Sequence, residues 1–222
     1  MEVIPPPTTT IISHRHQTNT FTAYDVTCFN HRVRTIVTCC PTVVTSWINH
    51  IRSNHHNPII VGLDTEGLNP IATLQLCVGS NCLIYQLVHS PFIPTALEDF
   101  LRDPQCKFSG VGVWGDSKRL VKDYDLVLSS TVEVGKVAAE EGRVRVNAGL
   151  KEVTKAVLGW EMKKDKNITM SKWDKDVLDE EQVLYACIDA FVSYHIGKEL
   201  IVPDDCVGDL EQSAYLEALE YV

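Results

Sequence analysis

Hydrophobic and polar positions change their spacing along the chain, and these changes predict where strands and helices lie. Between Phe21 and Cys40 they alternate in two runs around Asn30-His31, which is typical of a β-hairpin. From Pro41 to about Arg52 apolar residues recur three or four positions apart, which predicts an amphipathic helix with a proline in its first turn. The stretch from Pro58 to Leu63 is almost unbroken apolar, as in a strand buried on both faces of a sheet.

The middle and later parts of the chain alternate between the two kinds of element. The pattern predicts further strands over 71–78, 82–87 and 107–113. It predicts helices over 93–101, from about Ser117, over 148–158 and over 180–200. Hairpin-like strands followed by strand–helix alternation indicate an α/β fold with a mixed β-sheet flanked by helices.

The two ends of the chain lack this regularity. Residues 1–20 are rich in proline and threonine, and we expect a mobile N-terminal tail there. We expect one domain over 21–202. Residues 203–222 are expected to form an acidic helical extension, whose apolar side would carry Leu210, Tyr215, Leu216 and Leu219.

Composition agrees with a single globular domain. The chain has 222 residues, of which 45% are hydrophobic, enough for a full core. No apolar run approaches the ~20 residues that a membrane span needs, and the first residues lack the regions of a signal peptide. We therefore expect a protein of the cytoplasm or the nucleus. The eight cysteines include no C-x-x-C pair, which favours buried free thiols over a zinc site.

The net charge of −9 argues against a nucleic-acid partner, but its distribution changes that conclusion. Residues 105–175 carry 14 basic and 10 acidic side chains, so this part is positive while the rest of the chain is strongly negative. Its densest basic stretch, with an aromatic residue beyond it, is a candidate for contact with a nucleic-acid backbone and for base stacking: Lys163, Lys164, Lys166, Lys172 and Trp173. The alternative is an exposed polar loop.

Asp64 and Glu66 are two residues apart at the end of the buried strand, so both side chains project from one face. Carboxylates this close repel each other unless a cation lies between them, and a hard divalent metal is the natural partner. The D-x-E pattern occurs three times in the chain, and only this copy follows a buried apolar strand.

Two further candidates lie downstream. Asp116 follows a strand and Gly115 where a helix begins, so it is a candidate metal ligand or a helix N-cap. Tyr185 and Asp189 are four residues apart in a predicted helix, so they share one face, as a catalytic pair or a packing pair. Four converging acids could hold two divalent ions about 4 Å apart.

The order and context of these motifs resemble the DEDD-type 3′-5′ exonucleases of the ribonuclease-H-like fold, in the branch of the Werner-helicase exonuclease domain and ribonuclease D. The resemblance runs from about Val61 to Leu200, and the three aspartates are 52 and 73 residues apart. Its motifs are Leu63-Asp64-Thr65-Glu66, Leu74-Gln75-Leu76, Gly110-Val111-Gly112-Val113-Trp114-Gly115-Asp116, Asn147-Ala148-Gly149-Leu150-Lys151, Ser171-Lys172-Trp173 and Tyr185-Ala186-Cys187-Ile188-Asp189-Ala190.

The resemblance implies a DnaQ-like exonuclease fold and a two-metal hydrolytic site. Two Mg²⁺ or Mn²⁺ ions would be bound by four carboxylates, Asp64, Glu66, Asp116 and Asp189. Tyr185 would position the attacking water, and Leu184 stands where the other branch of the family has histidine, so this is the tyrosine subtype. The implied reaction releases nucleoside monophosphates from single-stranded 3′ ends, with RNA favoured over DNA.

The chain departs from the family pattern at two positions. Gly67 follows the first motif where a bulky residue is common, and Phe191 stands in place of a second tyrosine. The leading hairpin is similar to that of short plant members, which implies a homo-oligomer, with a ring hexamer as one form, and partners in small-RNA machinery. The alternatives are a catalytically silent relative that binds nucleic acid or protein, and an assembly protein with a fortuitous acid cluster.

Overall fold

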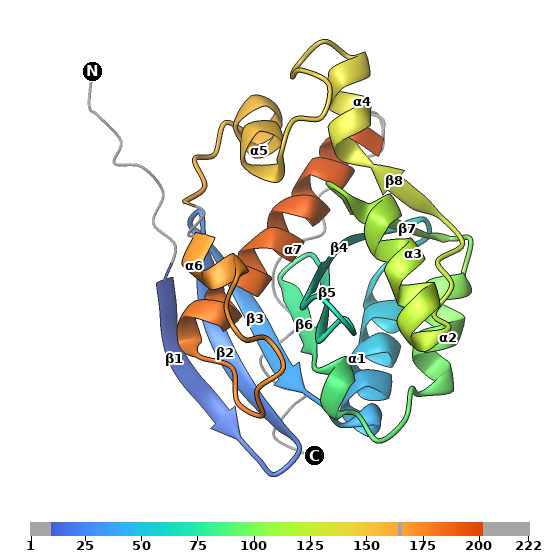
Figure 1. The fold of residues 1–222 in the computed structure, drawn as a ribbon, viewed down its shortest axis with the longest axis vertical. Coiled ribbons are helices and arrows are strands. Elements are labelled where there is room, and N and C mark those ends of the chain that lie inside the picture. The colour runs from blue at the N-terminus through green and yellow to red at the C-terminus, as the bar shows by residue number, and fades with distance from the viewer. Residues whose placement is uncertain (1–9, 164–165, 202–222) are drawn as a thin grey trace.

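The computed structural model describes residues 10–163 and 166–201, and a mixed β-sheet forms its centre (Figure 1). Eight strands lie in the order β1-β2-β3-β6-β5-β4-β7-β8. Pairing is antiparallel within β1–β2–β3 and within β6–β5–β4, and parallel from β3 to β6 and along β4–β7–β8. In chain order, their bounds are β1 Thr10–Gln17, β2 Phe21–Cys28, β3 His31–Thr38, β4 Ile59–Glu66, β5 Thr73–Val78, β6 Asn81–Tyr85, β7 Cys106–Gly110 and β8 Thr131–Glu133.

Helices cover both faces of this sheet. In β7, Phe108 contacts Phe100 of α2 edge-on, whereas the next residue, Ser109, donates a hydrogen bond to Ser193 of α7. Because neighbouring side chains on a strand point to opposite faces, α2 and α7 lie on opposite sides. The helices are α1 Pro41–Asn54, α2 Thr95–Arg102, α3 Val113–Tyr124, α4 Val134–Glu140, α5 Leu150–Leu158, α6 Lys166–Thr169 and α7 Glu180–Ile201, with a 3₁₀ turn at Leu87–His89.

The long helix α7 lies directly on β4 and β7. A Cβ atom on Gly62 would be 2.0 Å from the carbonyl oxygen of Ala190 and 2.4 Å from the backbone nitrogen of Tyr194. A Cβ atom on Gly197 would be 2.3 Å from the hydroxyl of Ser109. Glycine is therefore required at both crossings, and it brings the helix backbone into contact with the strands.

Most of the expected elements agree with the structure to within a few residues, whereas β1, β8 and α4 were not expected. The hairpin turns one residue earlier than expected, because Phe29 and Asn30 have positive φ angles of 48° and 70°. Helix α3 begins at Val113, ahead of the expected Ser117, with Gly112 as N-cap at φ 88°. Asp116 therefore lies in the first turn of α3, and the N-cap interpretation is wrong.

The expectation of a tail over residues 1–20 is wrong for its second half. Thr10–Gln17 is strand β1, which pairs with β2 in an antiparallel register from Thr10↔Thr27 to Gln17↔Thr22. A strand at the edge of a sheet can form from a polar segment because its neighbour supplies the hydrogen bonds. Residues 1–9 and the expected extension over 203–222 lie outside the described residues.

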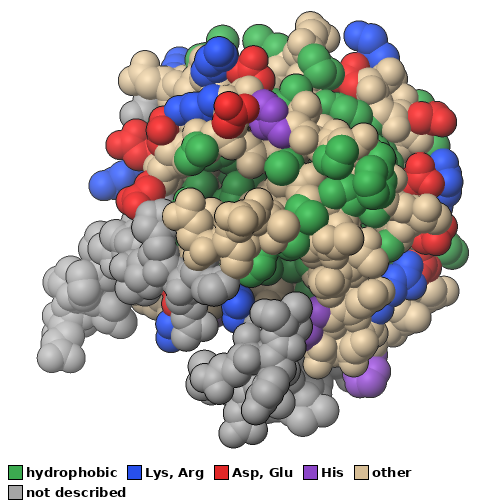
Figure 2. All heavy atoms as spheres, turned by 90° about the horizontal axis from the view of Figure 1, so that it is seen from below, with side chains coloured by type: hydrophobic (Ala, Val, Ile, Leu, Met, Phe, Trp, Pro, Cys, Tyr) green, Lys and Arg blue, Asp and Glu red, His purple; other side chains and the backbone are tan. Residues whose placement is uncertain are grey.

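The core and surface follow the composition. The seven described cysteines are free thiols, and five of them are buried. Within the described ranges no helix is long and apolar enough to cross a membrane. Figure 2 shows one face on which hydrophobic side chains gather towards the middle, with many charged side chains nearer the rim. Large apolar side chains that are exposed include Leu68, Phe92, Trp114 and Met170.

Candidate metal centre

Three carboxylates converge where α7 crosses the end of β4. Asp64 and Glu66 project from one face of β4, and Asp189 reaches them from α7. One oxygen of each lies within 4.8 Å of the other two. Asp189 is 2% exposed and Glu66 is 9% exposed, so much of this negative charge is removed from water. Three like charges at this separation repel one another unless they share a cation.

The donor set fits a hard divalent metal. Carboxylate oxygens are the ligands that Mg²⁺ and Mn²⁺ prefer, and close carboxylates from two elements are typical of such sites. The described cysteines and histidines add no softer donor to this cluster. The residues therefore form a possible divalent-metal site.

Asp116 lies next to this cluster but is not part of it. The hydroxyl of Thr65 donates a hydrogen bond of 2.6 Å to Asp116 Oδ1. Burial raises the pKa of Asp116, while the Thr65 bond and the nearby Arg119 guanidinium act in the opposite direction. Because side chains alternate along β4, Thr65 points away from Asp64 and Glu66 and links the strand to α3.

Arg119 makes a second link between α3 and the end of β4. Its guanidinium donates to the carbonyl oxygens of Gly67 and, at 3.2 Å, of Leu68, and it lies 3.9 Å from Asp116. Gly67 has a φ of +94°, and a Cβ there would be 2.6 Å from the nitrogen of Ala72. The tight turn after β4 therefore explains why a bulky residue is absent at Gly67.

Tyr185 lies one helical turn before Asp189 on α7, so its phenol faces the same region. The side chain is 7% exposed, and its hydroxyl accepts a hydrogen bond of 3.0 Å from Thr169 Oγ1. Its ring packs against Trp173 at 6.1 Å between centroids. The aromatic ring is thus fixed by the segment that precedes α7.

The candidate nucleic-acid residues divide into two groups. Lys163, Lys166 and Lys172 are exposed, as a backbone contact requires, and Lys164 lies outside the described residues. Trp173 is only 3% exposed, and its indole nitrogen donates to the carbonyl oxygen of Thr169. A base has no access to a ring buried in this way, so the expected stacking role of Trp173 is wrong.

Two buried glutamines hold the segment around Trp173, and the sequence pattern did not reveal them. Gln182 donates to Ser171 at 2.9 Å and to the carbonyl of Lys172 at 3.0 Å. Gln86 donates to the carbonyls of Lys175 and Asp176. The groups to which these two side chains donate lie ten or more residues away along the chain, so local spacing carries no sign of these contacts.

Phe191, the second departure from the family pattern, belongs to an aromatic cluster. Its ring stacks on Trp160 with an interplanar angle of 8°, and Trp160 also stacks on Phe29. His195 lies 4.4 Å from Phe191, and burial lowers the pKa of His195 to about 4. Phe191 therefore fastens the segment after α5 to the hairpin and α7.

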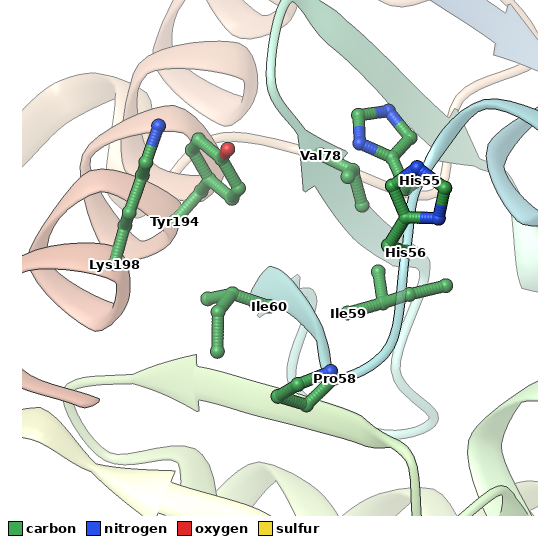
Figure 3. A pocket seen from close by; sticks show the side chains of 8 residues that line it. All are labelled: His55, His56, Pro58, Ile59, Ile60, Val78, Tyr194 and Lys198. Atoms are coloured by element: carbon green, nitrogen blue, oxygen red, sulfur yellow. The ribbon is translucent and has the colours of Figure 1, made fainter. Parts of the chain in front are cut away.

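A separate hollow lies at the opposite end of β4 (Figure 3). It measures ≈ 130 Å³, and Tyr194 and Lys198 face His55 and His56 across Ile60. Four residues separate Ile60 from Asp64, which corresponds to about 13 Å along a strand. The hollow contains none of the clustered acids and is distinct from the metal centre.

Most of the chain matches a known protein family. Residues 36–201 match the family model described as 3′-5′ exonuclease, three quarters of the chain. The chain belongs to the 3′-5′ exonuclease family. The match includes the three clustered acids, Asp116 and Tyr185, and it confirms the ribonuclease-H-like fold expected from the motifs.

Curated members of the exonuclease family align over the same region. The mouse bifunctional 3′-5′ exonuclease/ATP-dependent helicase WRN is 35% identical over 150 residues, which is 67% of this chain and 10% of the mouse protein. An Arabidopsis thaliana 3′-5′ exonuclease is 31% identical over 63% of this chain and 52% of its own length. The chain thus spans between a tenth and about half of these relatives.

A solved structure is also similar. The EXD2 exonuclease domain soaked in Mn has 26% sequence identity, with a TM-score of 0.46, over 75% of this chain and 88% of that chain.

We predict that Asp189→Asn stabilises the metal-free protein, because it removes one of three mutually repelling charges. The melting temperature in chelator should rise by about 2–4 °C for each kcal/mol gained. The rise that Mn²⁺ produces in the wild type should shrink in the variant, because a ligand is lost. Thermal unfolding with chelator and with Mn²⁺ measures both effects.

The matched control is Asp176→Asn, whose side chain is 94% exposed and should leave both melting temperatures unchanged. An Asp189→Asn protein that melts lower in chelator, together with a wild type that does not respond to Mn²⁺, would contradict a metal centre.

Proposed function

We propose that this protein is a metal-dependent 3′-5′ exonuclease that releases nucleoside monophosphates from single-stranded nucleic acid, with RNA preferred over DNA. The observation that carries the proposal is the convergence of Asp64, Glu66 and Asp189 within 4.8 Å, one helical turn from Tyr185. Family membership supports the same reaction.

The acids divide into two roles in this proposal. Asp64, Glu66 and Asp189 would hold a first Mg²⁺ or Mn²⁺, and Asp116 would contribute to a second. Such ions activate water and stabilise the leaving oxygen in phosphodiester hydrolysis. Thr65 and Arg119 keep Asp116 against the end of β4, so the fourth acid is held in place by the chain itself.

Tyr185 would position the attacking water. Its hydroxyl accepts a hydrogen bond from Thr169, which holds the phenol in place. The phenol sits on the side of α7 that carries Asp189, so it would orient a water beside the carboxylates. Lys163, Lys164, Lys166 and Lys172 are proposed to contact the backbone of the substrate.

The cellular setting remains part of the proposal. The similarity of the leading hairpin to short plant exonucleases supports RNA substrates and small-RNA machinery as the partner, in the cytoplasm or the nucleus. The catalytic domain is proposed to begin with β1, Thr10–Gln17, because this strand belongs to the central sheet, and to end near residue 202. The acidic extension over 203–222 is proposed on sequence alone.

Labelled single-stranded RNA and DNA, each with a free or a blocked 3′ end, test the reaction directly. We expect stepwise shortening of strands with free 3′ ends in Mg²⁺ or Mn²⁺, faster for RNA, and none in chelator. Asp64→Ala should lower turnover by orders of magnitude while circular dichroism shows an intact fold. Hydrolysis that persists in Asp64→Ala contradicts the proposal, and strand binding without hydrolysis by the wild type identifies a catalytically silent relative.

Tyr185→Phe should slow hydrolysis by roughly 10²–10⁴-fold, the usual contribution of a group that positions or transfers a proton. Metal affinity should stay close to that of the wild type, because the carboxylates are unchanged. Tyr194→Phe is the matched control, since Tyr194 has the same 7% exposure and lies on the same helix beyond the centre. A loss of Mn²⁺ binding in Tyr185→Phe, or an unchanged rate, contradicts this role.

We also propose that the protein is a homo-oligomer, with a ring hexamer as the leading form. Among the described residues, strand β1 is at the edge of the sheet, and the sequence of residues 203–222 predicts an apolar side for the acidic extension. Light scattering at micromolar concentration should give a multiple of 24.8 kDa. A mass near 24.8 kDa contradicts the oligomer.

A further inference from the structure

One tryptophan of the chain is unusually exposed. Trp114, in the first turn of α3, is 47% exposed, whereas Trp47 is 5% and Trp173 is 3% exposed. Burial of an indole ring stabilises a folded protein, so a tryptophan that stays this exposed often marks a binding surface. Trp114 lies two residues before Asp116, and the proposed mechanism leaves its side chain unused.

Two lysines flank this ring. The ammonium group of Lys136, on α4, lies over the Trp114 ring at 5.3 Å from its centroid. Lys118 is exposed and follows Trp114 by four residues, so both lie on one face of α3. Lys136 also pairs with Glu140 at 3.7 Å, but both are more than half exposed, and such pairs are weak. We call Trp114, Lys118 and Lys136 the α3–α4 platform.

The platform stands at the same edge of the sheet as the metal centre. Strands β4, β7 and β8 are parallel neighbours, so their carboxyl ends meet at one edge, and α3 and α4 begin just beyond the ends of β7 and β8 (Figure 1). Ser109 of β7 pairs with both Gly62 of β4 and Val132 of β8. Strands lie about 4.8 Å apart, so Val132 is about 10 Å from Gly62, two residues before Asp64.

The chain holds this arrangement rigidly. The backbone nitrogen of Gly112 donates to both carboxylate oxygens of Glu133, at 2.8 and 3.0 Å, which ties the start of α3 to the end of β8. A Cβ on Gly110 would be 2.7 Å from the carbonyl oxygen of Leu63, so β7 and β4 also meet closely there. The platform and the carboxylates therefore have a fixed spacing.

We propose that the α3–α4 platform binds the single-stranded substrate upstream of its 3′ end, with one base stacked on Trp114 and phosphates beside Lys118 and Lys136. An aromatic face between cations is the usual composition of single-strand binding sites. The platform belongs to the positive part of a chain whose net charge is −9, so it is suited to a polyanion. The inference rests on the proposed exonuclease function, because the metal centre fixes where the 3′ end lies.

Hydrolysis of RNA from dinucleotide to decanucleotide by the full chain tests the proposal. In the wild type, KM should fall with length. For Trp114→Ala the KM of long strands should rise about tenfold, in the range expected for loss of one stacked base, and the effect should grow with length. For Lys118→Gln and Lys136→Gln, the slope of log affinity against log salt should fall by about 0.7 each. Binding of the decanucleotide in chelator, followed by fluorescence anisotropy, should weaken in parallel.

Matched controls are Phe92→Ala, an aromatic side chain with 62% exposure, and Lys155→Gln, a lysine whose side chain is 69% exposed. Both should leave the length dependence and the salt slope unchanged. An unchanged decanucleotide affinity in Trp114→Ala overturns the platform and leaves a protein partner as its occupant. A defect of equal size at every length also overturns it, because that result indicates a distorted metal centre.

The two proposals fail in different ways. If the wild type hydrolyses no length of strand in Mg²⁺ or Mn²⁺, the exonuclease function fails. The anisotropy measurement in chelator then still decides the platform, since it needs no turnover.

Discussion

The contact between α7 and the strands beneath it is the constraint on which the site depends. At Gly62 the helix backbone is so close that a single methyl group would overlap the Ala190 carbonyl oxygen. Ala190 follows Asp189 directly, so the same contact that packs the helix also sets the height of a carboxylate above β4. The packing of α7 in the core therefore also fixes the geometry of the metal centre, because closely packed interiors transmit small displacements.

The site concentrates negative charge at the cost of stability. Asp189 is almost fully buried near Asp64 and Glu66, an arrangement that favours folding only when a cation is shared. Two of the links around it are hydrogen bonds from hydroxyl groups, Thr65 to Asp116 and Thr169 to Tyr185, which orient their partners without neutralising them. Arg119, 3.9 Å from Asp116, places a positive charge beside the fourth acid.

The spacing of hydrophobic residues predicted the strands and helices whose burial is visible within a short window of sequence. The apolar run of β4 and the spacing of Tyr185 and Asp189 identified the strand and the helix that carry the acids. Strand β1 was not predicted because its order comes from pairing with β2, and a short, largely polar segment gives no local sign of its partner. The burial of Trp173 was not predicted for a similar reason. Gln182 and Gln86 hold its segment in place through hydrogen bonds to residues ten or more positions away in the sequence.

Asp189 lies more than a hundred residues after Asp64 and Glu66, and this separation has a consequence for synthesis. Glu66 is made before Asp189, which lies in the last described helix. Strand β4 and helix α7 can meet only after α7 has left the ribosome, because long-range contacts must wait for both partners. A nascent chain therefore carries an incomplete acid cluster until α7 has emerged.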